Sequence, residues 1–105
     1  MATARLIPHS PELDHVLQHA AAIRVAVEAA GASNPRVIGK VARGESTNDE
    51  YVTLFVSDRP RLSLFRLVEL EQYLSDLLGR EVNVWSEEAF RPEERARYIA
   101  EAVAL

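Results

Sequence analysis

The stretch from Arg36 to Val56, RVIGKVARGESTNDEYVTLFV, decides the fold of this chain. It begins with a short apolar run and continues through GKVARGES, a turn of small and charged residues, to an acidic pair. It ends in Tyr51–Val56, a run rich in β-branched and aromatic residues that predicts a strand. The turn has the composition of an active-site loop, although the strand after it lacks the acids that such a loop usually serves.

The segment before this stretch predicts one helix and a short strand. Ser10, Pro11 and Glu12 form a helix start, with a hydroxyl cap, a proline in the first turn and an early acid. Gly31 ends the helix, and a strand is expected from Arg36 to Gly39. The residues of the helix that recur at three- and four-residue spacing predict a single apolar stripe: Leu13, Val16, Leu17, Ala20, Ile23, Val27 and Ala30.

The segment after it predicts a helix, a strand and a helix. Ser63 can cap a helix that ends at Gly79, Glu81–Trp85 predicts a third strand, and Pro92 opens a last helix through Ala102. The order α-β-β-α-β-α predicts an α/β fold with a small mixed sheet of about three strands, at least partly parallel. We expect the middle helix to bury these apolar residues: Leu64, Leu67, Val68, Leu70, Leu74, Leu77 and Leu78.

Length and composition limit the class of protein. A chain of 105 residues predicts a single domain, residues 1–105, with residues 1–8 as a flexible lead-in. The formal net charge of −4 argues against direct nucleic-acid binding, which needs a basic face. The absence of cysteine excludes disulfides and thiolate metal sites. No apolar run approaches the roughly 20 residues of a membrane span, so we expect a cytoplasmic protein without a membrane partner.

Three motifs carry a resemblance to a known family. They are ARGE at Ala42–Glu45, SLFRLVELE at Ser63–Glu71 and LLGREV at Leu77–Val82. Together with the order of the predicted elements, these motifs make residues 37–105 resemble the minimal nucleotidyltransferase (MNT) family. Members of this family are small prokaryotic domains of the DNA polymerase β-like fold. The resemblance implies transfer of a nucleotide from a nucleoside triphosphate, with two magnesium ions held by an Asp-x-Asp pair on the second strand and a third acid on the third strand. Residues i and i+2 of a strand share a face, so such a pair delivers both carboxylates to one site.

The residues that the resemblance places at the site differ from the family pattern. Gly39 matches the family's glycine, Lys40 replaces a serine, and the ARGE residues match. The two strand aspartates fall on Tyr51 and Thr53, and the third acid falls on Asn83. The resemblance therefore implies a degenerate site with no catalytic residue, no bound magnesium and no cofactor.

A shifted register does not restore the acids. Asp49 and Glu50 are adjacent, so an extended backbone sends their side chains to opposite faces. Gly39, Lys40 and Arg43 could still hold a phosphate without metal near a helix N-terminus. Alternatively, Lys40 is a surface side chain and Arg43 pairs with a nearby acid. GKVARGES is not a P-loop, because the spacing of that motif is missing.

Two further groups of residues have a functional and a structural interpretation. His15 and His19 have the spacing of a two-histidine metal site, with His9 nearby, but no pattern places a third ligand, and a solvated or interface face is favoured. Five aromatic residues follow strand and helix burial, which favours a core role, with Tyr51 and Trp85 partly exposed: Tyr51, Phe55, Phe65, Trp85 and Phe90.

Three functions remain open on the sequence. The first is a catalytically inactive binding module, the antitoxin-type partner of an all-helical HEPN-like RNase toxin, acting by contact. Its acidic groups could face a basic partner. The second is a nucleotidyltransferase with a residual, unconventional NTP site, in which Asp49 would take part. The third is a stand-alone scaffold or homo-oligomer. The acidic groups are Glu69, Glu71 and Asp76, and Glu87, Glu88, Glu93 and Glu94.

Overall fold

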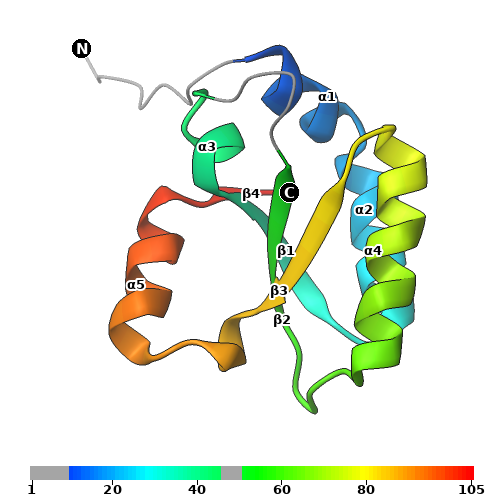
Figure 1. Ribbon diagram of the computed structural model, residues 1–105, viewed down its shortest axis with the longest axis vertical. Helices are drawn as coiled ribbons and strands as arrows, with labels where there is room; N and C mark the ends of the chain where they lie inside the picture. Colours follow the sequence, from blue (N-terminus) through cyan, green and yellow to red (C-terminus); the bar gives the residue numbers. More distant parts are fainter. Residues whose placement is uncertain (1–9, 46–50) are drawn as a thin grey trace.

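The computed structural model describes residues 10–45 and 51–105, which form a mixed sheet between two layers of helices (Figure 1). In these residues the strands are β1 (Ser33–Ile38), β2 (Val52–Ser57), β3 (Val82–Ser86) and β4 (Val103–Ala104), in the order β3-β2-β1-β4. β2 and β3 are parallel, and β1 is antiparallel to both β2 and β4. The predicted α/β class and the partly parallel sheet are confirmed, whereas β4 is an additional strand.

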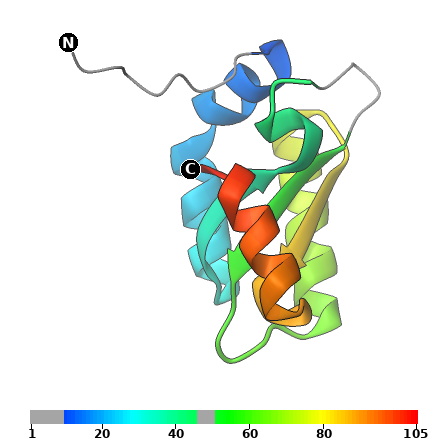
Figure 2. The same ribbon diagram turned by 90° about the vertical axis from the view of Figure 1, so that its left-hand side faces the viewer.

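The helices cover the two faces of the sheet unequally. They are α1 (Pro11–Gln18), α2 (Ala20–Ala30), the short α3 (Gly39–Ala42), α4 (Leu64–Leu78) and α5 (Pro92–Glu101), with a 3₁₀ turn at Glu87–Ala89. α2 and α4 lie side by side on one face, and α5 lies alone on the other (Figures 1 and 2). None of the helices in the described residues is long and apolar enough to cross a membrane.

The predicted first helix is wrong in one respect, because it is broken at His19. Its start is confirmed, since the Leu13 N–H donates to Ser10 Oγ at 3.1 Å, and Gly31 ends α2 with a φ of +100°. At the break, the His19 backbone N–H donates to the Val16 carbonyl, three residues back, at 3.0 Å. The His19 ring Nδ1 lies 2.9 Å from the His15 carbonyl, which a continuous helix would offer to the His19 backbone. The apolar stripe continues across the break at His19, so the periodicity of apolar residues alone does not reveal the break.

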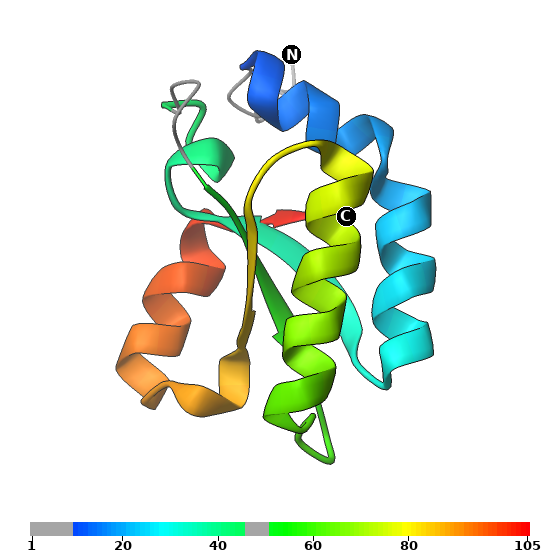
Figure 3. The same cartoon turned by 45° about the vertical axis from the view of Figure 1, so that its right-hand side comes forward.

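The main core lies between the sheet and the helices α1, α2 and α4 (Figure 3). Alternate residues of β2 and β3 face it, among them Val52, Leu54 and Val84. From α4 the buried residues are Leu70, Leu74 and Leu78, one on each successive turn. Two residues predicted to be buried are instead exposed, Leu64 by 77% and Val68 by 48%. They lie off the stripe of α4 that carries Leu70, Leu74 and Leu78 toward the core, and the sequence spacing alone does not fix which stripe is buried.

α4 also binds the outer edge of the sheet. Its ends are as predicted, since Ser63 Oγ accepts the Arg66 N–H at 3.1 Å and Gly79 has a φ of +67°. β3 is an edge strand, and its backbone N–H groups at Val82 and Val84 point away from β2 toward α4. Ser75 Oγ accepts the first at 3.0 Å and Glu71 Oε2 accepts the second at 2.8 Å. Two donors of the edge strand are thereby satisfied within the chain.

Candidate functional site

Strand register brings two of the three predicted site positions together. In the parallel pair of β2 and β3, Thr53 lies directly opposite Asn83. Their neighbours Val52 and Leu54 face the main core, so Thr53 and Asn83 face the other side of the sheet, which α5 partly covers. Both side chains are partly buried. Tyr51 lies two residues before Thr53, at the start of β2, and is exposed.

The donor set at this position does not fit a two-magnesium centre. A phenol, a hydroxyl and an amide stand where the family pattern has carboxylates, and magnesium in such centres is held by carboxylates that neutralise its charge. Within residues 10–45 and 51–105, no group of three or more His, Asp or Glu side chains is placed to hold a metal ion. Asp49 and Glu50 lie outside the described residues.

The loop before β2 is built on a glycine and two buried apolar residues. Gly39 opens α3 with a φ of +80°, a conformation that favours glycine, and a Cβ at this position would contact nothing within 4 Å. Val41 and Ala42 are buried and hold the short helix against the strands, whereas Lys40 is exposed. Gly39 therefore allows the chain to turn from β1 into α3.

Arg43 is engaged by two carboxylates. Its Nη1 donates to Glu101 Oε2 at 2.5 Å, and its Nε donates to Glu45 Oε1 at 3.3 Å. The hydrogen bond to Glu101, followed by that to Glu45, raises the pKa of the Arg43 guanidinium. The interpretation that Arg43 pairs with a nearby acid is confirmed for Glu45. Glu101 could not be found from the sequence, because it lies at the end of α5, far along the chain.

An aromatic cluster holds α5 against the same face of the sheet. Phe55 is fully buried, and its ring centroid lies 5.6 Å from that of Phe90 and 5.8 Å from that of Tyr98. Trp85, opposite Phe55 on β3, extends the cluster to the surface. The guanidinium of the buried Arg36 lies 5.2 Å from the Phe55 ring centroid and forms an ion pair with Glu87.

The aromatic prediction is therefore confirmed for most of its residues. Phe55 and Phe90 pack as core residues, and Tyr51 and Trp85 are exposed at the surface, as expected. The prediction is wrong for Phe65, whose side chain is 72% exposed on α4. Phe65 follows Leu64, which is also exposed, so the apolar side chains in the first turn of α4 are not buried in the core.

The two histidines on the first helices have a packing role. The His15 ring Nε2 lies 2.7 Å from the Leu78 carbonyl at the end of α4, and the His15 and His19 rings meet edge to face at 4.8 Å. Both side chains are partly buried, so of the expected solvated or interface face the solvated alternative is wrong. Each ring uses one nitrogen on a carbonyl, and the contact of His15 with Leu78 binds α1 to α4. His9 lies outside the described residues.

Comparison with known proteins gives one informative similarity. No protein-family model matches the chain, and no curated protein sequence matches it. A solved structure described as a "putative minimal nucleotidyltransferase" superposes on it with a TM-score of 0.80 and 31% sequence identity. The similarity covers 89% of this chain and 95% of that chain.

Proposed function

Because this chain belongs to the minimal nucleotidyltransferase family, we propose that it is a catalytically inactive member that works by binding another protein in the cytoplasm. The partner that we propose is an all-helical HEPN-like protein, an RNase toxin, which this chain would neutralise by contact as an antitoxin. The observation that carries the proposal is the pairing of Thr53 with Asn83 across β2 and β3.

The chemistry of that pair supports loss of catalysis. Transfer through two metals needs several carboxylates that converge on one face of the sheet. Here a hydroxyl and an amide meet at the register position where the family pattern brings carboxylates together. Arg43, the cation of the ARGE motif, already binds Glu101 and Glu45 and would have to break these hydrogen bonds to hold a phosphate.

An exposed apolar surface supports a role in protein contact. We define the α4 patch as Leu64, Phe65 and Val68, whose side chains are 77%, 72% and 48% exposed. Three large apolar side chains on neighbouring turns are typical of a surface that another protein covers. A helix of the partner can lay its apolar face on such a patch. The net charge of −4 suits a partner that presents a basic surface, as an RNA-binding enzyme does.

Co-expression with the helical protein encoded next to this chain tests the proposal. We expect the two proteins to co-purify and the growth defect caused by the partner alone to be relieved. Phe65→Ser should abolish both effects, because it removes the one aromatic ring of the patch. Tyr73→Ser is the matched control, since Tyr73 is equally an exposed aromatic residue of α4 but lies on another flank. Failure of the wild-type protein to bind or to protect would refute the antitoxin role.

A second experiment tests the loss of catalysis. Incubation of the purified protein with labelled ATP, magnesium and the candidate partner should transfer no label. Label transfer that Asp49→Asn abolishes would instead support a residual, unconventional NTP site. In that case, relief of toxicity would depend on Asp49 as well as on Phe65.

A further inference from the structure

The face of the sheet that carries Thr53 and Asn83 has a small apolar core of its own on the side of α5 (Figures 1 and 2). Ile38 on β1 lies directly opposite Thr53, and Phe55 follows Thr53 by two residues on β2, so both side chains share its face. Ile38 and Phe55 are 1% and 0% exposed, and α5 lies against β1 on this side. Two fully covered apolar side chains therefore flank Thr53.

The helix over this small core buries little apolar surface itself. None of the residues Pro92–Glu101, all of which the structure describes, is buried, and Ile99 is 44% exposed. The hydrogen bonds of Glu94 and Arg95 go to the segment directly before the helix. A helix that packs firmly on a sheet presents an apolar stripe to it instead. Of the four partly buried side chains of α5, one is aromatic and three are charged: Tyr98, Glu94, Arg95 and Glu101.

Two side chains join the middle and the end of α5 to the rest of the fold. The Tyr98 ring packs on the Phe55 ring, with 5.8 Å between the centroids. At the last residue of the helix, Glu101 Oε2 accepts the hydrogen bond from Arg43 Nη1 at 2.5 Å. The side chains of this ion pair are 40% exposed for Arg43 and 21% exposed for Glu101, so water and salt weaken it.

The segments on either side of α5 have attachments of their own. Before the helix, the Phe90 ring packs against the rings of Phe55 and Trp85, at centroid distances of 5.6 and 5.5 Å. After it, β4 pairs with β1, and the Leu105 N–H donates to the Pro35 carbonyl at 3.1 Å. The chain is thus anchored at both ends of a weakly attached helix.

Unwinding of α5 lets this segment leave the sheet while both anchors stay in place. Its ten residues span roughly 15 Å as a helix and up to roughly 33 Å when extended, which provides ample slack. A helix of ten residues does not persist by itself in water, so α5 unwinds once it loses its contacts with the sheet. Opening therefore exposes the surface beneath α5 without unfolding the main core.

We propose that α5 is a strap that opens and closes over the Thr53–Asn83 face, with the ion pair of Arg43 and Glu101 as its latch. In the closed state the strap covers Ile38 and Phe55. In the open state these two side chains become accessible beside Thr53, and Arg43 is released. The strap thereby controls how much of this face a ligand can reach. The inference does not rest on the proposed function, because it involves neither the α4 patch nor a partner.

Hydrogen exchange of the purified protein, followed for single amides by NMR, tests the opening. The amides of residues 96–101 should exchange at least tenfold faster than those of residues 70–78 in α4. Their rates should also depend little on low concentrations of urea, as is characteristic of a local opening. Equal rates in the two helices would show that α5 leaves the sheet only when the whole protein unfolds, and would overturn the strap.

Variants of the two carboxylates on Arg43 test the latch. Glu101→Gln should accelerate the exchange of α5 relative to α4 by roughly two- to fivefold, as loss of one exposed ion pair allows. Without a latch, the same variant should slow the exchange, because it removes a negative charge from the C-terminal end of the helix. Glu45→Gln is the matched control and should not accelerate it, since Glu45 binds the same guanidinium but lies outside α5. Exchange in Glu101→Gln equal to or slower than in wild type would overturn the latch.

An engineered thiol measures access to the covered face. The chain has no cysteine, so Ile38→Cys adds a single thiol under the strap, and Val37→Cys adds one on the main-core side of the same strand. After correction for the overall stability of each variant by urea unfolding, Ile38→Cys should react with a thiol reagent at least tenfold faster. Glu101→Gln should accelerate Ile38→Cys alone. Equal labelling of the two thiols would refute control of access, whereas binding of a partner through Phe65 is measured separately and would be unaffected.

Discussion

At the scale of single residues, Thr53 and Asn83 place two neutral side chains at facing positions of the sheet. They lie opposite each other on neighbouring parallel strands, where their side chains share one face of the sheet. Two carboxylates at these positions would repel each other unless a cation lay between them. A hydroxyl and an amide avoid that repulsion and still offer hydrogen bonds to water or to each other.

The double variant Thr53→Asp with Asn83→Asp should make the stability of the fold depend on a bound cation. Without magnesium, we expect like charges on facing positions to lower the free energy of unfolding by about 1 kcal/mol. Magnesium should recover part of this loss, because it binds the folded state alone. Urea unfolding with and without magnesium measures both effects, with Thr53→Asn as the neutral control. No response to magnesium would mean that the cleft has lost the shape as well as the acids of a metal site.

The ion pair between Arg59 and Glu88 gives a pH-dependent prediction. Both nitrogens of the Arg59 fork donate to Glu88 at 3.1 Å, and these hydrogen bonds lower the pKa of the Glu88 carboxyl from its ordinary value of 4.5. A lowered pKa means that the pair stabilises the fold above about pH 4.5 and that this contribution is lost as the pH falls through the pKa of the folded state.

Arg59→Gln should therefore raise the pKa of Glu88 toward its ordinary value. Titration of the side-chain carboxyl carbon by NMR checks this change. Arg97→Gln serves as the control, because Arg97 is also an exposed arginine of this region but makes no contact with Glu88 in the described structure. An unchanged titration of Glu88 in Arg59→Gln would show that the ion pair does not persist in solution.

At the scale of elements, α4 protects the edge of the sheet as well as filling the core. Edge strands expose backbone donors that can pair with other chains. Glu71 and Ser75 of α4 accept two of these donors, from Val84 and Val82. Glu71 and Ser75 are thus polar for a structural reason, and the Glu71 carboxylate is engaged within the chain, unlike the acidic contact surface expected for Glu69, Glu71 and Asp76.

Glu71→Ala should destabilise the protein by about 1–2 kcal/mol, because the Val84 N–H loses its acceptor at a buried position. Glu71→Gln should cost less, since its amide oxygen can accept the same hydrogen bond. Urea unfolding measures the difference, and hydrogen exchange of the Val84 amide should accelerate in the alanine variant only. Equal stability of the two variants would indicate that water replaces the carboxylate without cost.

The elements that the sequence predicted correctly have strong local signals. Ser10, Ser63 and Gly79 mark helix ends through hydrogen bonds and backbone angles within a few residues of the signal. The break at His19 and the two-residue strand β4 lack such signals. The first leaves the apolar stripe intact, and the second forms only because β1 offers it an open edge. Non-local contacts decide both features, so periodicity could not reveal them.

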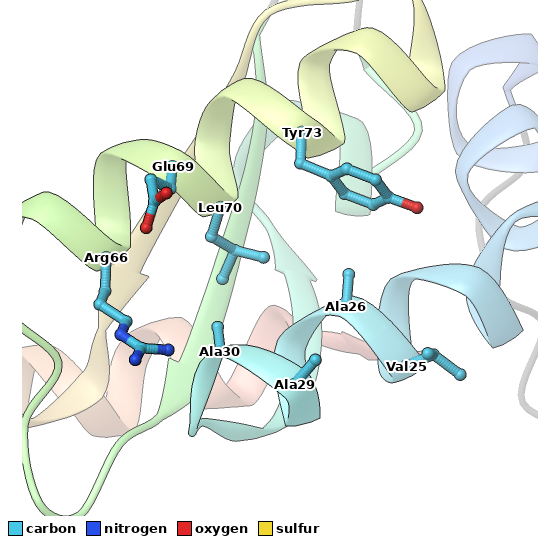
Figure 4. Close-up of a pocket in the computed structure, with 8 residues that line it drawn as sticks. All are labelled: Val25, Ala26, Ala29, Ala30, Arg66, Glu69, Leu70 and Tyr73. Atoms are coloured by element: carbon cyan, nitrogen blue, oxygen red, sulfur yellow. The ribbon is translucent and has the colours of Figure 1, made fainter.

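At the scale of the whole molecule, the sheet separates three surfaces. The Thr53–Asn83 face lies on the α5 side, and a groove of about 430 Å³ between α2 and α4 lies on the other side (Figure 4). The α4 patch lies on the outer flank of that helix. Thr53 and Asn83 lie on neighbouring strands, as the order of predicted elements implied, but the groove could not be foreseen, because it is formed by two helices that are far apart in the sequence.

The hydrogen bonds of Arg43 have a consequence for the detection of related proteins. Arg43 joins the loop after β1 to Glu101 at the end of α5, and Val41 and Ala42 fill space beneath it. Most of the loop's residues thus serve folding, and selection for a folded chain retains them whether or not nucleotides are transferred. A search pattern based on A-R-G-E therefore recognises the scaffold and carries no information about the residues at positions 51, 53 and 83.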